Sequence, residues 1–199
     1  LGLLKQGYPA EQIIVNDPNE TKRAFFAELG VQTAQDNAVS AKRADAVLLA
    51  VKPQMMAEVC RCLAGVDFSD KLLISIAAGI STARLQTLIP SAKSVVRVMP
   101  NTPALVSEGM AGLFAAKNTA QADCIFVQEL LNTVGKTLWL QDEAQMHAIT
   151  AASGSSPAYF FQMLEAMQQA LVEMNLDADS ACTLVRQAIF GAAKMATDN

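Results

Sequence analysis

Short apolar runs recur along the first two thirds of the chain, and helical spacing follows each of the earlier ones. The runs cover residues 13–15, 44–51, 71–76 and 95–99. Strands that alternate with helices at this spacing predict a right-handed parallel α/β sheet. The run at 44–51, which is unbroken from Ala46 to Val51, predicts a strand that is buried on both faces. Two later runs, near 109–114 and 137–140, predict further strands of this part.

The alternation ends after Gln141. Residues 143–199 contain no β-branched run of strand length, only helical patterns rich in Ala, Met, Leu and Gln. We therefore predict an α/β domain over residues 1–142 and an all-helical domain over residues 143–199. The helix expected at 157–174 has an apolar surface too broad for one core stripe, which indicates burial against a partner chain. Both ends of the chain lie within helical patterns, so we expect a fragment of a longer protein.

Composition narrows the class of protein. Hydrophobic residues make up 52%, and the net charge of −4 with a pI near 5.0 argues against a nucleic-acid partner. No apolar run reaches the roughly 18 residues that a membrane span needs. The four cysteines are scattered and form no metal-binding pattern with His147, which we expect to be structural. We predict a cytoplasmic protein without a metal site.

The predicted strands end in polar or small residues, at Asn16–Asp17, Val51–Pro53, Ala77–Gly79 and Met99–Thr102. In a doubly wound sheet these ends meet at one edge, where ligands bind. Ala-Ala-Gly would let a flat ligand approach the backbone, and Lys52 offers a positive charge to a phosphate or carboxylate. The edge therefore predicts a nucleotide site. For Ala77–Gly79 alone, close packing of helix on sheet is the alternative.

Two loops carry candidate binding groups. Pro100 and Pro103 stiffen the segment that contains Asn101 and Thr102, although a proline-rich turn would have the same composition. Small hydroxylated residues also collect before Pro157, where the 157–174 helix begins. Ser155 or Ser156 could cap that helix, or its free amides could hold a carboxylate.

An ordered set of motifs resembles the pyrroline-5-carboxylate reductase family. They are Ala50-Val-Lys-Pro-Gln54, Ala77-Ala-Gly79, Arg97-Val-Met-Pro-Asn-Thr-Pro103, Glu108-Gly109, Ser153-Gly-Ser-Ser-Pro-Ala-Tyr159 and Gly191-Ala-Ala-Lys-Met195. The resemblance implies a Rossmann-like domain followed by a helical dimerisation domain. It also implies an enzyme that reduces 1-pyrroline-5-carboxylate to L-proline with hydride from NADPH or NADH, the last step of proline biosynthesis. The implied assembly is a homodimer or a ring of dimers.

The resemblance assigns two groups of residues. The cofactor would contact Asp17, Asn19, Asn37, Ala50, Val51, Lys52, Pro53, Ala77, Ala78 and Glu143. The substrate pocket would include Met99, Asn101, Thr102, Ser153 and Ser155. An acidic side chain at Asp17 favours NAD by repelling a 2′-phosphate, whereas Lys22 or Arg23 could offset it, so both cofactors stay open.

No catalytic residue is assigned. The resemblance implies that the proton donor and the substrate-carboxylate loop would follow Asn199. It also implies that an opening strand with its glycine-rich turn would precede Leu1, and that without this central strand the sheet would have a gap and exposed backbone.

Two other hypotheses remain. One is an NAD(P)-dependent oxidoreductase of the two-domain 3-hydroxyacid dehydrogenase type, which would need a catalytic lysine such as Lys194 in the helical domain. The other is a non-catalytic nucleotide-binding protein, expected if the fragment is the natural whole.

Overall fold

The computed structural model describes residues 1–198 and divides into two units, Leu1–Gly154 and Ser155–Asn199. The first unit alternates short strands with helices, as predicted. Its elements are α1 (Gly2–Lys5), η1 (Ala10–Gln12), β1 (Ile14–Asn16), α2 (Glu20–Glu28), β2 (Gln32–Ala34), α3 (Asn37–Arg43), β3 (Ala46–Leu49), η2 (Pro53–Met55), α4 (Met56–Cys62), β4 (Leu72–Ser75), α5 (Thr82–Leu88), β5 (Ser94–Met99), η3 (Thr102–Val106), β6 (Gly109–Ala115), α6 (Gln121–Asn132), β7 (Gly135–Trp139), η4 (Glu143–Gln145), α7 (Met146–Ile149) and the π-helical turn η5 (Thr150–Gly154).

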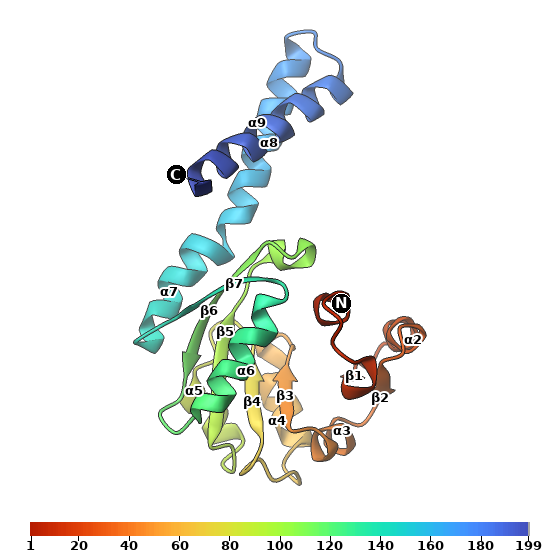
Figure 1. Ribbon diagram of the computed structural model, residues 1–199, viewed down its shortest axis with the longest axis vertical. Coiled ribbons are helices and arrows are strands. Elements are labelled where there is room, and N and C mark those ends of the chain that lie inside the picture. The colour runs from red at the N-terminus through yellow and green to blue at the C-terminus, as the bar shows by residue number, and fades with distance from the viewer. Residues whose placement is uncertain (199) are drawn as a thin grey trace. The chain divides into compact units, whose positions relative to one another are not determined.

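The strands form two sheets (Figure 1). β1 and β2 pair in parallel, and a five-stranded sheet has the order β3-β4-β5-β6-β7. Strands β3, β4 and β5 are parallel to one another, but β6 is antiparallel to β5. The predicted parallel arrangement holds for β3, β4 and β5, whereas the two later strands, whose direction was not predicted, run opposite to these three. Only the short segment between Met99 and Gly109 joins β5 to β6, and a parallel crossover needs a dozen or more residues.

Strand β3 is an edge strand. The side chain of Leu48 is 48% exposed, whereas Leu49 is 4% exposed. The prediction that this strand is buried on both faces is wrong, because β3 pairs only with β4 in the described chain. Within residues 1–198, β3 and β1 belong to separate sheets, and no ladder joins them.

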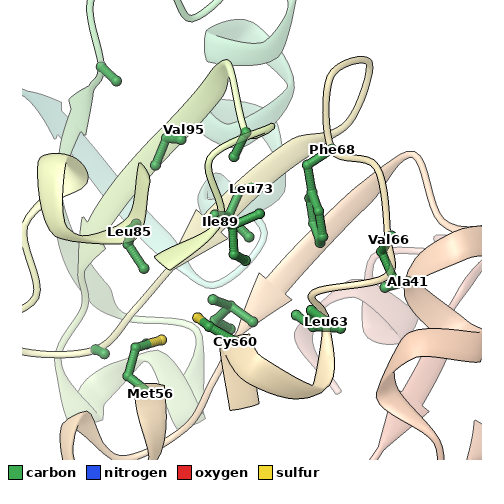
Figure 2. Packing of buried hydrophobic residues seen from close by; sticks show 14 residues of the cluster. Ala41, Met56, Cys60, Leu63, Val66, Phe68, Leu73, Leu85, Ile89 and Val95 are labelled. Atoms are coloured by element: carbon green, nitrogen blue, oxygen red, sulfur yellow. The ribbon is translucent and has the colours of Figure 1, made fainter. Parts of the chain in front are cut away.

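Each face of the five-stranded sheet carries its own core. On one face, residues of α4, α5 and the segments around Phe68 pack against inward side chains of β3, β4 and β5 (Figure 2). On the other face, Val127 of α6 packs with residues of β4, β5 and β6. Phe68, Leu73 and Val95 are fully buried, and burying such a side chain is worth about 1.5–3 kcal/mol. These two cores hold the strand ends in place.

The second unit is a hairpin of α8 (Ser156–Glu173) and α9 (Ala178–Asp198). Asn175 has a φ of 68° in the turn between them, as a residue after a helix end often does. Ala181 and Val185 are buried, while most of the large apolar side chains of the hairpin are exposed. They include Tyr159, Phe160, Phe161, Met163, Met167, Met174, Leu184, Phe190 and Met195.

Candidate active site

The carboxyl ends of three parallel strands lie side by side. Leu49 of β3 pairs in register with Ser75 of β4, which pairs with Arg97 of β5. The predicted loops at 51–53, 77–79 and 99–102 therefore leave the sheet at one edge. The fourth predicted end, Asn16–Asp17, closes β1 in the separate two-stranded sheet.

This edge offers open backbone. Ala77 is buried, whereas Ala78 and Gly79 are exposed. Gly79 has a φ of +75°, and a Cβ built on it would meet no atom within 4 Å. The neighbouring loop presents Lys52, which is exposed and lies outside both ion pairs of the described chain. A flat, negatively charged ligand such as a dinucleotide fits these groups.

Ala50, Val51 and Pro53 flank Lys52 in the predicted cofactor set. Ala50 is exposed, and the other two are half-buried. Pro53 begins η2, where its missing backbone donor costs no helical hydrogen bond. Asn37 is half-buried and is the first residue of α3, whose N-terminus is capped by Asp36.

Asp17 is held by its neighbours after β1. Its Oδ1 accepts a hydrogen bond from the Asn19 amide at 2.8 Å, and its Oδ2 lies 3.3 Å from Lys22 Nζ. The hydrogen bond from the Asn19 backbone amide, together with the charge and hydrogen bond of Lys22, lowers the pKa of the Asp17 carboxyl. The Arg23 guanidinium donates to the Asp17 carbonyl at 2.6 Å. Asp17 is therefore ionised at neutral pH, with two cations beside it.

Asn19 itself serves as a helix cap. Its side chain accepts a hydrogen bond from the Lys22 amide at 3.2 Å and so satisfies one free donor at the start of α2.

The loop after β5 is tied to two other segments. Asn101 Oδ1 accepts a hydrogen bond from the Met110 amide at 2.8 Å, at the start of β6. Asn101 Nδ2 lies 3.1 Å from Ser153 Oγ, in the π-helical turn. Sequence analysis placed Asn101 and Ser153 in one pocket, and the structure brings them into direct contact.

Met99 and Thr102 frame the same loop. Met99 is half-buried, and its Cε lies 2.9 Å from the position that a Cβ on Gly154 would take. Thr102 is exposed at the start of η3. π-helical turns are rare and are often found at functional sites, and this one packs directly on Met99.

Glu143 lies in a cluster that sequence analysis did not foresee. Its Oε1 accepts hydrogen bonds from the Thr82 amide and from Arg97 Nη1, both at 2.9 Å. Its Oε2 accepts one from Thr82 Oγ1 at 2.9 Å. The carboxylate thus joins η4 to the N-terminus of α5 and to β5. Arg97 was the available signal, because a charge inside the apolar run Val-Val-Arg-Val-Met needs a partner.

Some residues that sequence analysis singled out do not join the strand edge. Ser155 belongs to the second unit, unlike Ser153, and it holds the N-cap position of α8 without a side-chain capping bond. Of the two predicted caps, Ser155 and Ser156, Ser155 therefore does not cap the helix with its side chain. His147 is exposed on α7. Residues 1–198 contain no disulfide and no His, Cys, Asp and Glu group suited to a metal ion. Within the same residues, no helix has the length and apolar character of a membrane span.

Two surface pockets lie away from the strand edge. One of about 290 Å³ is lined by β6, α6 and β7 residues such as Cys124 and Trp139, and one of about 400 Å³ lies between α8 and α9. Neither contains a predicted site residue. Burial raises the pKa of the Cys124 thiol, which keeps it protonated near neutral pH.

Two family models match the chain. "NADP oxidoreductase coenzyme F420-dependent" matches residues 1–79, and "Pyrroline-5-carboxylate reductase dimerisation" matches residues 143–199. Together with the open strand edge, they define an NAD(P)H-dependent oxidoreductase with a Rossmann-like domain and a helical dimerisation domain.

Solved structures and a curated relative give the family. A pyrroline-5-carboxylate reductase of Haemophilus influenzae is 72% identical over the whole chain, which covers 73% of that protein. The structure of the Coxiella burnetii enzyme has a TM-score of 0.91 at 37% identity, with 100% of this chain and 74% of the other covered. The Plasmodium falciparum enzyme, solved with NADP bound, has a TM-score of 0.90 at 29% identity, with 100% and 73% covered. This chain belongs to the pyrroline-5-carboxylate reductase family.

Family membership decides among the three functions considered from the sequence. The protein is an NAD(P)H-dependent oxidoreductase of proline biosynthesis that acts on a small molecule and forms a homo-oligomer. The alternative of a 3-hydroxyacid dehydrogenase type is not supported, and neither is a non-catalytic nucleotide-binding protein. Lys194, which the first alternative required, is exposed on α9.

Proposed function

We propose that the edge formed by the ends of β3, β4 and β5 binds NAD(P)H in extended form. The observation that carries this proposal is the exposed, unobstructed backbone at Ala78–Gly79 beside the cationic Lys52. Ala50, Val51, Pro53 and Ala77 complete the lining. Lys52 would attract a cofactor phosphate, and the small side chains would let the cofactor lie against the backbone.

The adenosine end would lie near the carboxyl end of β1. Asp17, Asn19 and Asn37 are the residues proposed there. The ionised Asp17 suits a ribose 2′-hydroxyl, while Lys22 and Arg23 supply positive charge within reach of a 2′-phosphate. Both cofactors remain compatible with this arrangement.

The nicotinamide end would lie at the loop after β5. Bound NAD(P)H would supply the hydride that adds to the imine carbon of 1-pyrroline-5-carboxylate, and the ring nitrogen would take up one proton to give the amine of L-proline. The loop and the turn that carry Met99, Asn101, Thr102 and Ser153 would hold the planar substrate in line with the hydride. Ser155 is proposed as a further substrate-binding residue. Orientation of this kind supplies much of the rate acceleration in a hydride transfer.

Glu143 is proposed to act on the cofactor edge through Thr82. Its carboxylate already accepts three hydrogen bonds from the chain, so its contribution is to hold the start of α5. This helix follows directly on the Ala77–Gly79 loop.

Blocking the edge tests the proposal. We expect Ala78→Trp to abolish NADPH-dependent reduction of 1-pyrroline-5-carboxylate and to weaken NADPH binding by more than about tenfold, because the indole would occupy the cofactor's path. Ala122→Trp, on the exposed surface of α6, is the matched control and should leave both properties unchanged. Full activity of Ala78→Trp with wild-type fluorescence on NADPH binding would refute the assigned edge.

Two further points are proposals. We place the boundary of the helical domain at residue 143, where the dimerisation family model begins, although residue contacts group 143–154 with the α/β unit. Limited proteolysis with mapping of the first cut tests this boundary.

We also place the protein in the cytoplasm because its cysteines are free, and fractionation of the native cells tests that location.

A further inference from the structure

The side chain of Asn101 forms its hydrogen bonds with other groups of the protein. Oδ1 accepts from the Met110 amide at 2.8 Å, and Nδ2 donates to Ser153 Oγ at 3.1 Å and to the Ser153 carbonyl at 3.3 Å. The orientation of the amide group is unambiguous, because the Met110 N–H only donates and the Ser153 carbonyl only accepts. Both donors of the amide therefore face the π-helical turn.

A fourth hydrogen bond closes the arrangement. Ser153 Oγ donates to the Met110 carbonyl at 3.3 Å, so Asn101, Met110 and Ser153 form a ring of contacts. All three residues are half-buried. They come from three segments: the loop after β5, the start of β6 and the turn Thr150–Gly154.

The ring fixes what lies next to it. Gly154 packs against the tip of Met99, so a displacement of the π-helical turn moves the methionine side chain at the end of β5. Thr102 follows Asn101 directly and is exposed. The residues proposed to face substrate therefore depend on the Asn101–Ser153 contact for their positions.

We propose that Asn101 is a positioning residue: it clamps the π-helical turn against the loop after β5 through Ser153, and it does not contact the substrate through its amide N–H groups. This inference rests on the proposed function, because it concerns the pocket assigned there. A substrate contact through these N–H groups would have to break the bonds to Ser153. The same clamp assigns Ser153 a positioning role.

A double-mutant cycle in the full-length protein tests the clamp. The variants are Asn101→Asp, which removes both donors and keeps the acceptor for Met110, Ser153→Ala, and their combination. Asn118→Asp, on the exposed loop before α6, is the matched control. The readouts are kcat and KM for 1-pyrroline-5-carboxylate at saturating NADPH, the Kd for NADPH and the melting temperature.

We expect each single variant to lower kcat/KM by roughly 10- to 100-fold, since small displacements at a reacting centre cost this much. The double variant should be no worse than the poorer single variant, because both single variants already remove the hydrogen bond between Asn101 Nδ2 and Ser153 Oγ. The Kd for NADPH should change less than about threefold, and Asn118→Asp should behave as wild type. A purely structural weakening would lower the melting temperature and impair kcat/KM and NADPH binding together.

Other results overturn the inference. Losses that multiply in the double variant would show that Asn101 acts on the substrate independently of Ser153 Oγ. Hydrogen exchange of the Asn101 side-chain amide gives a readout without turnover. Slow exchange that Ser153→Ala accelerates supports the clamp even if the reductase assay fails, whereas fast exchange in the wild type refutes the clamp while leaving the reductase activity standing.

Discussion

The carboxylate of Glu143 and the guanidinium of Arg97 lie 2.9 Å apart, and the arginine side chain is only 10% exposed. Removing the partner of a buried charge is costly because the charge stays unpaired. We expect Glu143→Ala to lower the free energy of unfolding by about 3 kcal/mol. Urea denaturation measures this loss, and Glu129→Ala on the exposed face of α6 is the control.

Replacing both partners should restore much of that stability. The variant Arg97→Met with Glu143→Met removes the two charges together, so we expect it to be more stable than Glu143→Ala alone. If the single and double variants unfold at the same urea concentration, the ion pair does not carry the stability assigned to it.

Asp17 should bias the choice of cofactor. Its lowered pKa keeps the carboxylate ionised through the neutral range, where it repels a 2′-phosphate. We expect Asp17→Ser, which keeps an acceptor for the Asn19 amide, to raise the ratio of kcat/KM for NADPH to that for NADH by roughly tenfold. Steady-state kinetics with both cofactors measure the ratio, and Asp70→Ser controls for loss of a surface charge. An unchanged ratio would remove Asp17 from the adenosine site.

Asp177 should make the helical hairpin sensitive to acid. Hydrogen bonds from the Ser180 side chain and amide lower the pKa of its carboxyl. A carboxyl with a lowered pKa in the folded state stabilises the fold above its unfolded pKa, and this contribution is lost as the pH falls through the folded pKa. We therefore expect the melting temperature to decrease when the pH is lowered below about 4. Asp177→Asn, which keeps a capping oxygen but does not titrate, should show a smaller acid effect in thermal denaturation at each pH.

Phe190 should contribute to the homo-oligomer. It is 64% exposed on α9, in the unit that matches the dimerisation family model. An aspartate buried in an apolar interface loses its hydration, so we expect Phe190→Asp to weaken subunit association by at least about 2 kcal/mol. Light scattering over a range of protein concentrations measures this effect. Phe25→Asp, an exposed aromatic of α2 in the other unit, should keep the wild-type mass.

Strand positions followed from local sequence, whereas strand direction and exposure did not. Runs such as the one ending at Met99 are apolar and are stopped by proline, so both the strand and its end are local properties. The direction of β6 depends on the length of the preceding connection, and the exposure of Leu48 depends on which strands flank β3. These properties belong to the assembled sheet.

For the candidate site, the positions of the loops could be predicted more fully than the contacts between their residues. The loops at 51–53, 77–79 and 99–102 could be placed at one edge, because parallel strands end together. The contacts of Asn101 with Ser153 and of Arg97 with Glu143 join residues far apart in sequence, and no local pattern specifies such pairs. The family resemblance supplied both Asn101 and Ser153 but not their bond.

The reversal between β5 and β6 also bears on how the protein folds. Met99 and Gly112 pair across this hairpin, and no other pairing in the five-stranded sheet joins residues so close along the chain. Short loops close with the smallest loss of chain entropy, whereas the crossovers on either side must order a helix and its connections first. The loop that carries Asn101 is therefore enclosed by the most local strand pair of the sheet, and hydrogen-exchange labelling during refolding should find β5 and β6 protected together and early.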